Sequence, residues 1–159
     1  MTSYVLTPIR IAPALWAGAA VGAAGVTIWF SLPAFFDPVG AAQIGSVTSA
    51  IFFVAIVIWS LGLVVIGGPL WREQHRRGKT APANALTLGL IATFVAAFAL
   101  NLLLTASATG IMEGGRVLIE DGHRTVYGWF ILFKDCILLS LLGGVVATVI
   151  WRIAYRTER

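Results

Sequence analysis

Four long apolar stretches occupy most of this chain, and only short polar connectors separate them. They cover residues 11–32, 45–67, 86–108 and 128–151. A helix that crosses the hydrocarbon core of a bilayer needs about 20 consecutive, predominantly apolar residues, and each stretch is long enough. The sequence therefore predicts an all-α fold, an integral membrane four-helix bundle, with residues 1–159 forming a single transmembrane domain.

Composition supports this class and excludes others. Charged residues make up 11% of the 159 residues, against about 25% in an average soluble domain. The formal net charge is +4, but the basic residues flank the apolar stretches, so no nucleic-acid-binding patch is expected. The single cysteine, Cys136, excludes an intramolecular disulfide and a Cys-rich metal site.

Arginine and lysine accumulate on one side of the predicted membrane, whereas the connectors on the other side carry most of the acidic residues. Short loops rich in these basic residues stay cytoplasmic. We therefore expect both termini in the cytoplasm (N-in, C-in) and a bacterial-type inner (plasma) membrane. The basic side comprises Arg10, Arg72, Arg76, Arg77, Lys79, Arg152, Arg156 and Arg159, and an aromatic belt of Trp16, Trp71, Trp151 and Tyr155 follows it.

Local signals predict where the spans end. The Gly-Gly-Pro motif at residues 67–69 is a strong stop signal for the second span. Asn84 is a plausible N-cap for the third span. Residues 33–38 are expected to turn along the outer interface. The connector at residues 110–127 predicts either a small hairpin or a segment that lies on the membrane.

The first span has a face of small residues. Gly18, Gly22 and Gly25 lie among alanines, and a Gly-x-x-x-Gly spacing lets two helix backbones approach closely in lipid. This face predicts either packing within the bundle or homodimerisation. Trp59, near the expected bilayer midplane, is interpreted as a packing residue.

Lys134 and Asp135 are ionisable residues inside the fourth span. Each costs about 2.5–3.5 kcal/mol to insert at the centre of a spanning helix, and such residues raise a functional hypothesis by default. With Trp151 at the inner boundary, Asp135 lies about 9 Å outward of the midplane. Lys134 can extend to the headgroups, but Asp135 must find a partner, take up a proton or face water. Because neighbouring helical residues point in different directions, we expect Asp135 to meet other spans.

Further polar residues fall at a similar depth and predict a polar cluster around Asp135. The cluster would open outward and be closed by an apolar inner half. It could be a hydrogen-bonded plug with Asp135 bound to Asn101 or Thr105, a pocket for a small molecule or lipid headgroup with Lys134 as counter-charge, or a proton or ion site. Its other members are Thr27 and Ser31, Thr48 and Ser49, and Asn101 and Thr105.

The sequence assigns no catalytic residue, metal site or cofactor. Haem held between helices commonly needs a facing pair of His ligands, but His75 and His123 fall in connectors on opposite sides of the membrane. His123 with Glu120 and Asp121 is a weak external metal candidate. Neither a nucleophilic serine elbow nor a phosphate-binding loop is present.

The first span resembles a known pattern. Trp16-Ala-Gly18 leads to Leu32-Pro33-Ala34-Phe35-Phe36 and then to an Ala/Gly segment at residues 40–45. This is similar to the family of unknown function that includes the human four-helix transmembrane protein associated with cisplatin resistance. His123-Arg124 ahead of Tyr127 is similar to the start of that family's last helix. The resemblance implies the four-helix fold but little mechanism.

Two enzyme types are similar in outline. The four-helix protoporphyrinogen oxidase type resembles this chain around Trp16, but it places a His shortly before that Trp, where this chain has Ile11-Ala-Pro-Ala-Leu15. Without that His the resemblance does not carry the activity to this chain. Small cofactor-free membrane oxygenases of the anthrone type are similarly shaped.

The sequence thus leaves three functional hypotheses. The leading one is a non-enzymatic accessory or assembly subunit of a larger membrane complex, with membrane lipids and other subunits or further copies as partners. The second is a small-molecule or lipid-headgroup binder or transporter that uses the cluster at Asp135. The third is a membrane enzyme acting on a lipid-soluble substrate.

Overall fold

The chain is mostly helical, with two small sheets at opposite ends. The computed structural model describes residues 4–6, 10–35 and 44–157. The helical segments are α1 (Ile11–Phe35), α2 (Ile44–Gly62), the π-helical η3 (Leu63–Gly67), α3 (Gly68–Arg76), α4 (Pro82–Thr105) and α5 (Val126–Ala154). The strands are β1 (Tyr4–Leu6), β2 (Gly110–Glu113), β3 (Arg116–Glu120), β4 (His123–Arg124) and β5 (Tyr155–Thr157).

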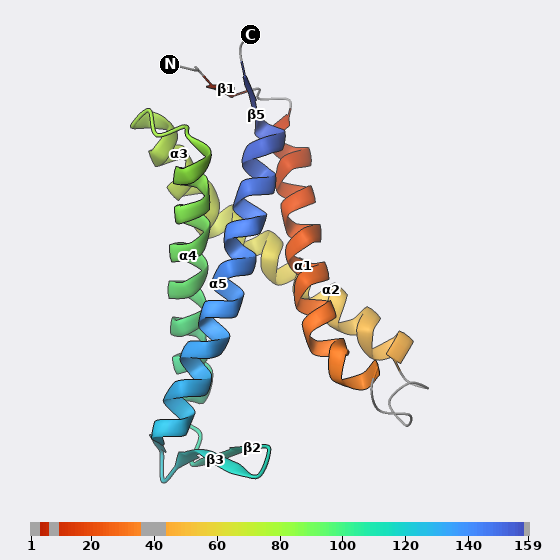
Figure 1. The fold of residues 1–159 in the computed structure, drawn as a ribbon, viewed down its shortest axis with the longest axis vertical. Coiled ribbons are helices and arrows are strands. Elements are labelled where there is room, and N and C mark those ends of the chain that lie inside the picture. The colour runs from red at the N-terminus through yellow and green to blue at the C-terminus, as the bar shows by residue number, and fades with distance from the viewer. Residues whose placement is uncertain (1–3, 7–9, 36–43, 158–159) are drawn as a thin grey trace.

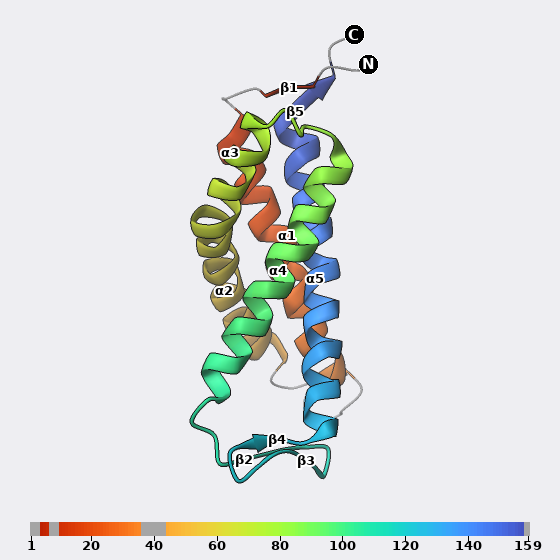
Figure 2. The same ribbon diagram turned by 90° about the vertical axis from the view of Figure 1, so that its left-hand side faces the viewer.

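Four helical stretches are long and apolar enough to cross a membrane, which confirms the predicted spans. They are Ile11–Leu32, Gly45–Arg76, Pro82–Thr105 and Val126–Ala154. The two ends of the molecule differ in character (Figures 1 and 2). The "basic end" carries the chain termini, α3 and the connector to α4, with Arg72, Arg76, Arg77, Lys79 and Arg152. The "sheet end" carries β2, β3 and β4.

The helices pack unevenly, since some pairs are in extensive contact and others are not. α4 packs extensively against α5, and α1 packs against both α5 and α2. In Figure 1, α5 lies in front between α4 and α1, while α2 lies behind. Among the described residues, α2 and α4 make no extensive contact with one another. The α1–α2 pair therefore diverges from the α4–α5 pair towards the sheet end (Figure 1).

The predicted stop at residues 67–69 is wrong, because the second span continues through it to Arg76. Gly67 and Gly68 both have right-handed helical backbone angles, and the N–H of Gly68 donates to the Leu63 carbonyl. Pro69 has no N–H and would break the hydrogen-bond pattern of an ordinary α-helix. The wider π turn directly before it shifts that pattern, so the proline stands in the first turn of α3.

Other predicted boundaries also shift. Asn84 is not an N-cap, since α4 begins at Pro82, where a proline fits the first helical turn. α4 ends at Thr105. Thr125 caps α5, because its side chain accepts a hydrogen bond from the Gly128 N–H at 3.0 Å. Helix α1 runs through to Phe35, so the first half of the predicted turn, residues 33–35, is helical instead. Residues 36–38, and residues 40–43 of the Ala/Gly segment, lie outside the described residues.

The structure is mostly helical, as predicted, and it adds two small sheets that the all-α prediction did not contain. The outer connector forms an antiparallel three-stranded sheet in the order β2-β3-β4, so the hairpin alternative is confirmed and extended. Its tight turn uses Gly114 and Gly115 at φ +57° and +77°, angles that glycine adopts without steric cost. Leu118 and Ile119 are buried against Ile131 of α5. At the other end β1 pairs with β5.

Glycines set how closely the helices approach. A Cβ built on Gly18 would lie 2.5 Å from Ile150, and one on Gly25 would lie 2.6 Å from Leu142. Gly22 instead packs against the ring of Trp59, which places Trp59 as the packing residue expected. The small face of α1 is therefore occupied inside this chain, by α5 and α2.

Candidate functional site

The ionisable pair in α5 does not sit in a shared polar cluster. Lys134 Nζ lies 3.4 Å from Asp135 Oδ1, and the two side chains are 41% and 44% exposed. Within the described part of the chain, Lys134 is the only partner that Asp135 has. The expectation that Asp135 would meet another span is therefore not met in the described residues.

Asn101 and Thr105 bind a different residue. Arg124 Nη2 donates to Asn101 Oδ1 and to Thr105 Oγ1, each at 2.5 Å. The Arg124 guanidinium also lies 5.8 Å from the centre of the Trp129 ring. Arg124 thus ties the start of α5 to the last turns of α4. From the sequence, Arg124 entered only the resemblance to the start of the four-helix family's last helix, although its position just before the fourth span put it within reach of the end of the third.

The remaining residues of the predicted cluster are also dispersed. Thr27 donates to the Ala23 carbonyl at 2.8 Å, and Ser49 donates to the Gly45 carbonyl at 2.7 Å, each within its own helix. Ser31 and Thr48 share a hydrogen bond of 3.1 Å between α1 and α2. The structure therefore divides the predicted cluster into separate contacts and does not assemble it around Asp135.

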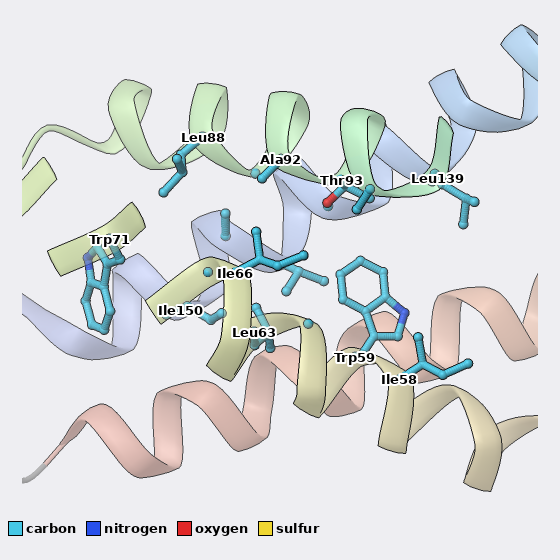
Figure 3. Close-up of a pocket in the computed structure, with 18 of the residues that line it drawn as sticks. Ile58, Trp59, Leu63, Ile66, Trp71, Leu88, Ala92, Thr93, Leu139 and Ile150 are labelled. Atoms are coloured by element: carbon cyan, nitrogen blue, oxygen red, sulfur yellow. The ribbon is translucent and has the colours of Figure 1, made fainter. Parts of the chain in front are cut away.

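A cavity of about 290 Å³ opens instead between α4 and the α2–η3 segment. Figure 3 shows side chains from α4 and from α2–η3 facing one another across it, with α5 behind. Almost all of its lining is apolar, and the Thr93 hydroxyl is one of the few polar groups. Prominent lining residues are Trp59, Leu63, Ile66, Leu88, Ala92 and Thr93. We call this space the groove.

The groove follows from side-chain size and from the course of the second span. On α4, the wall consists of small residues such as Ala92 and Ala96. Gly89 lets α4 approach Gly143 of α5 backbone to backbone, which draws α4 towards α5 and away from α2. The π turn of η3 forms the opposite wall, and single π turns inside α-helices are frequent at functional sites.

An aromatic cluster lies at the basic end, next to the groove. Trp71 Nε1–H donates to the Tyr155 hydroxyl at 3.2 Å, and His75 Nδ1 lies 3.1 Å from the same oxygen. Trp151 stacks on Tyr155 at 6.0 Å between ring centres, and its own N–H donates to the Thr80 carbonyl at 2.8 Å. Burial raises the pKa of the Tyr155 phenol above its ordinary value, against a smaller lowering by the Trp71 hydrogen bond.

A second cavity, of about 360 Å³, adjoins the groove at this end. The two cavities share the lining residues Leu15, Leu63 and Trp71. Arg72, His75 and Tyr155 contribute to its lining, but the surface that the second cavity exposes is almost entirely apolar, as in the groove. From the sequence, Trp71 and Tyr155 were expected only as belt residues. Nothing in the spacing of Trp71, His75 and Tyr155 showed that they converge, since 80 residues separate His75 from Tyr155.

The external metal candidate does not form a metal-ligand group. In the residues that the structure describes, no three His, Cys, Asp or Glu side chains come close enough to hold an ion. Glu120 and His123 face one another as paired residues of β3 and β4, and Asp121 stands in the turn between them.

Comparison with known proteins adds no relative. No protein family, curated protein or solved structure matches this chain. The resemblance of the first span to the four-helix family therefore stays a prediction. What the geometry defines is a mostly helical, candidate four-span membrane protein with a lateral apolar groove.

Proposed function

We propose that this chain is an integral membrane protein that binds a lipid-soluble amphiphile. The apolar body of the ligand lies in the groove between α4 and α2–η3, and its polar end lies at the basic end. The observation that carries the proposal is the apolar groove and its adjoining second cavity, which reaches Arg72, His75 and Tyr155 at the basic end. The binding site proposed here is the groove, and not the outer cluster at Asp135 on which the second sequence hypothesis depended.

The groove suits an apolar ligand for two reasons. Ligand sites are concave, largely apolar and carry a few polar groups that fix orientation, and the groove follows this composition. At about 290 Å³ it lies near the lower end of the range of small-molecule sites, which is roughly 300–1,000 Å³. In a bilayer its open side faces acyl chains, so a ligand can enter laterally without crossing water.

The basic end, beside the second cavity, suits a polar, preferably anionic, end group. Arg72 offers a permanent positive charge, and the Tyr155 hydroxyl and the His75 ring offer hydrogen bonds. The connector at this end adds Arg76, Arg77 and Lys79. Basic residues next to a span attract anionic lipid headgroups and stay cytoplasmic. We therefore propose that the basic end faces the cytoplasm and that the ligand comes from that leaflet.

Fluorescence quenching tests the groove. The detergent-solubilised full chain is titrated with dibromostearic acid, whose bromines quench tryptophan on contact, and Trp59 and Trp71 line the cavity. We expect saturable quenching, with a large part of it lost in Trp59→Phe. Ala96→Leu, which fills the groove, should weaken binding about tenfold. Ala99→Leu is the matched control, because Ala99 lies on an exposed side of the same helix.

Two outcomes separate the parts of this proposal. Quenching that rises without saturation, and that is equal in Ala96→Leu and Ala99→Leu, would show simple partitioning and overturn the groove. The methyl ester of the same acid tests the polar end, since it keeps the chain but lacks the charge. We expect the ester to bind more weakly and to lose its difference from the acid in Arg72→Gln. Equal binding of acid and ester would remove the second cavity from the site and leave the groove.

A second candidate function is the accessory subunit, and one observation favours it. Lys134 and Asp135 are each more than one-third exposed within a membrane-spanning helix, and charged residues in spans almost always face a protein interior or a water-filled cavity. A neighbouring protein would cover them. Purification from mild detergent with a stoichiometric second protein would support this candidate.

A further inference from the structure

The Lys134–Asp135 pair is a charged site within the membrane that this chain leaves uncovered. Both side chains are charged, and each is the only partner of the other in the described residues. The ion pair is only partly covered, because both side chains retain more than one-third of their exposure. In hydrocarbon such groups need further polar contacts. The face of α5 that carries the pair decides which neighbouring groups can supply those polar contacts.

α5 uses two faces inside the chain. Towards α4, Ser140 donates to the Leu90 carbonyl at 2.8 Å, and Gly143 contacts Thr93. Towards α1, Leu142 and Ile150 pack over glycines. A third face, the one in front in Figure 1, has no helix against it. At about 100° per residue, Leu138, Leu141 and Val145 point away from both of these contacts, and they are 36%, 56% and 52% exposed.

Leu138 marks the centre line between the two charges. At about 100° per residue, Lys134 points about 40° to one side of Leu138, and Asp135 points about 60° to the other side, towards α1 and within about 20° of Leu142. Asp135 lies seven residues nearer the sheet end than Leu142, where α1 diverges from α5 (Figure 1). Val145, seven residues further on, points within about 20° of Leu138. The third face therefore has an apolar line through Leu138 and Val145, with a positive charge on one flank and a negative charge on the other at nearly the same depth.

This arrangement is complementary to itself under a two-fold rotation. In a symmetric dimer, residue i of one copy meets residue j of the other, and residue j meets residue i. An axis parallel to α5 in front of Leu138 turns the positive flank of one copy towards the negative flank of the other. Lys134 then meets Asp135 of the second copy twice, and Leu138 and Val145 pack at the axis.

We propose that this protein forms a two-fold dimer through the exposed face of α5, held by a four-residue network of the two Lys134–Asp135 pairs. A second copy is favoured over an unrelated partner because the charges complement themselves without any added group. The glycine face of α1 is not the interface, since Gly18, Gly22 and Gly25 are covered by Ile150, Trp59 and Leu142 of the same chain. The dimer is independent of the ligand groove, which lies on the α2 side of α5.

Charge reversal with rescue tests the network. Two copies of the full chain with different affinity tags are co-expressed, solubilised in mild detergent and isolated through one tag. We expect the wild-type copies to be isolated together. Lys134→Asp or Asp135→Lys places like charges opposite one another, and each change made in both copies should reduce co-isolation about tenfold or more.

Two combinations should restore the dimer. The double exchange K134D/D135K reverses both flanks and recreates two opposite-charge pairs. Mixing a Lys134→Asp copy with an Asp135→Lys copy also pairs each acidic side chain with a lysine. Both should return co-isolation to near the wild-type level, which a variant that had merely lost its fold cannot do. Arg116→Asp, an exposed change at the sheet end, is the control and should have no effect.

Every other result overturns the proposal. Wild-type copies that are not isolated together exclude the dimer, and a stoichiometric foreign protein in the same preparation would favour the accessory subunit. Single reversals that leave co-isolation unchanged exclude this face. If both single reversals lose co-isolation and neither combination restores it, the charges do not face one another. The neutral pair K134Q/D135N, which inserts at lower cost, should show an intermediate loss.

Discussion

The two ends of this molecule are built on different principles. At the basic end, side chains from α3 and α5 meet at Tyr155 of β5, through Trp71, His75 and Trp151. At the sheet end, the α1–α2 pair stands apart from the α4–α5 pair (Figure 1). There the polar contacts join only neighbouring elements, such as Arg124 to α4 and Ser31 to Thr48.

The difference shows how one small helical protein can combine closely packed helices with an open groove. Glycines bring α5 against both α1 and α4, and this contact holds the two helix pairs together. Away from it, no small-residue contact joins α2 to α4, and the groove remains. Charges are tolerated where the helices diverge, because a partner or water can reach them there. The predictions below weaken one end or the central contact in turn.

The largest expected effect is at the central contact. A Cβ on Gly143 would overlap the Thr93 side chain and would lie 2.8 Å from the Gly89 carbonyl, which belongs to the backbone and cannot turn aside. Gly143→Ala should therefore lower the free energy of unfolding by about 2–3 kcal/mol. Gly62→Ala is the matched control, since nothing lies within 4 Å of its Cβ position, and it should be neutral or stabilising by up to about 1 kcal/mol.

Thermal or SDS-induced unfolding, followed by far-UV circular dichroism, measures both glycine variants. The two changes add the same methyl group to a helix, so their difference isolates the overlap with α4. Equal stabilities would mean that α4 and α5 are further apart than the structure has them.

The next effect is at the sheet end. Arg124→Met keeps the apolar length of the side chain but removes the donor to Asn101 and Thr105. Hydrogen bonds to charged groups contribute roughly 1.5–3 kcal/mol, so a loss of about 2 kcal/mol is expected in the same unfolding assay. Arg116→Met is the control, because Arg116 is exposed and its guanidinium lies 5.0 Å from the centre of the Tyr127 ring. Arg116→Met should cost less than about 1 kcal/mol.

Much of the fold could be predicted from the sequence because length and hydropathy decide it. Each span needed only a count of apolar residues, and all four were confirmed. The predicted helix boundaries were wrong where the same residues are compatible with two backbone conformations. Gly67-Gly68-Pro69 reads as a stop in water-exposed helices, but a π turn absorbs it here. α4 begins at Pro82, two residues before Asn84, so Asn84 does not cap it.

The site was harder to predict because it depends on contacts between distant segments. Depth alone grouped Asp135 with Asn101 and Thr105, but depth does not say which helix face a residue occupies. The sequence predicted that Lys134 and Asp135 lie within a span, and it could not show that Arg124 binds Asn101 and Thr105. No sequence motif marks the groove, since it forms where α2 and α4 do not pack against one another.

A smaller effect is expected at the basic end. Tyr155→Phe keeps the ring that stacks on Trp151 but removes the oxygen that bonds Trp71 and His75. A typical hydrogen bond contributes about 1 kcal/mol net, so a loss of about 1–2 kcal/mol in unfolding free energy is expected. Tyr127→Phe is the comparison, since the described structure gives its hydroxyl no hydrogen bond. An equal loss in both variants would argue against the cluster.

The same tyrosine predicts a pH dependence at alkaline pH. Burial raises the pKa of Tyr155 above its ordinary value, so the folded state favours the neutral phenol. The unfolded chain ionises near pH 10. Stability should therefore be constant below about pH 10 and fall as the pH rises towards the higher folded pKa. This fall should be absent in Tyr155→Phe, and tyrosinate absorbance should show one late-titrating group that the variant lacks.

The smallest effect on fold stability is expected at the ion pair, and it separates a structural plug from an interface. Replacing both members, as Lys134→Gln with Asp135→Asn, removes the pair without leaving one charge alone. Because the two side chains contact only each other in the described residues and are partly exposed, unfolding of the dilute, monomeric protein should change by no more than about 0.5 kcal/mol. A hydrogen-bonded plug between the spans would instead lose roughly 2 kcal/mol or more. A small change in unfolding together with weaker co-isolation of tagged copies places the role of the pair between molecules, whereas a large change would return it to the inside of the chain.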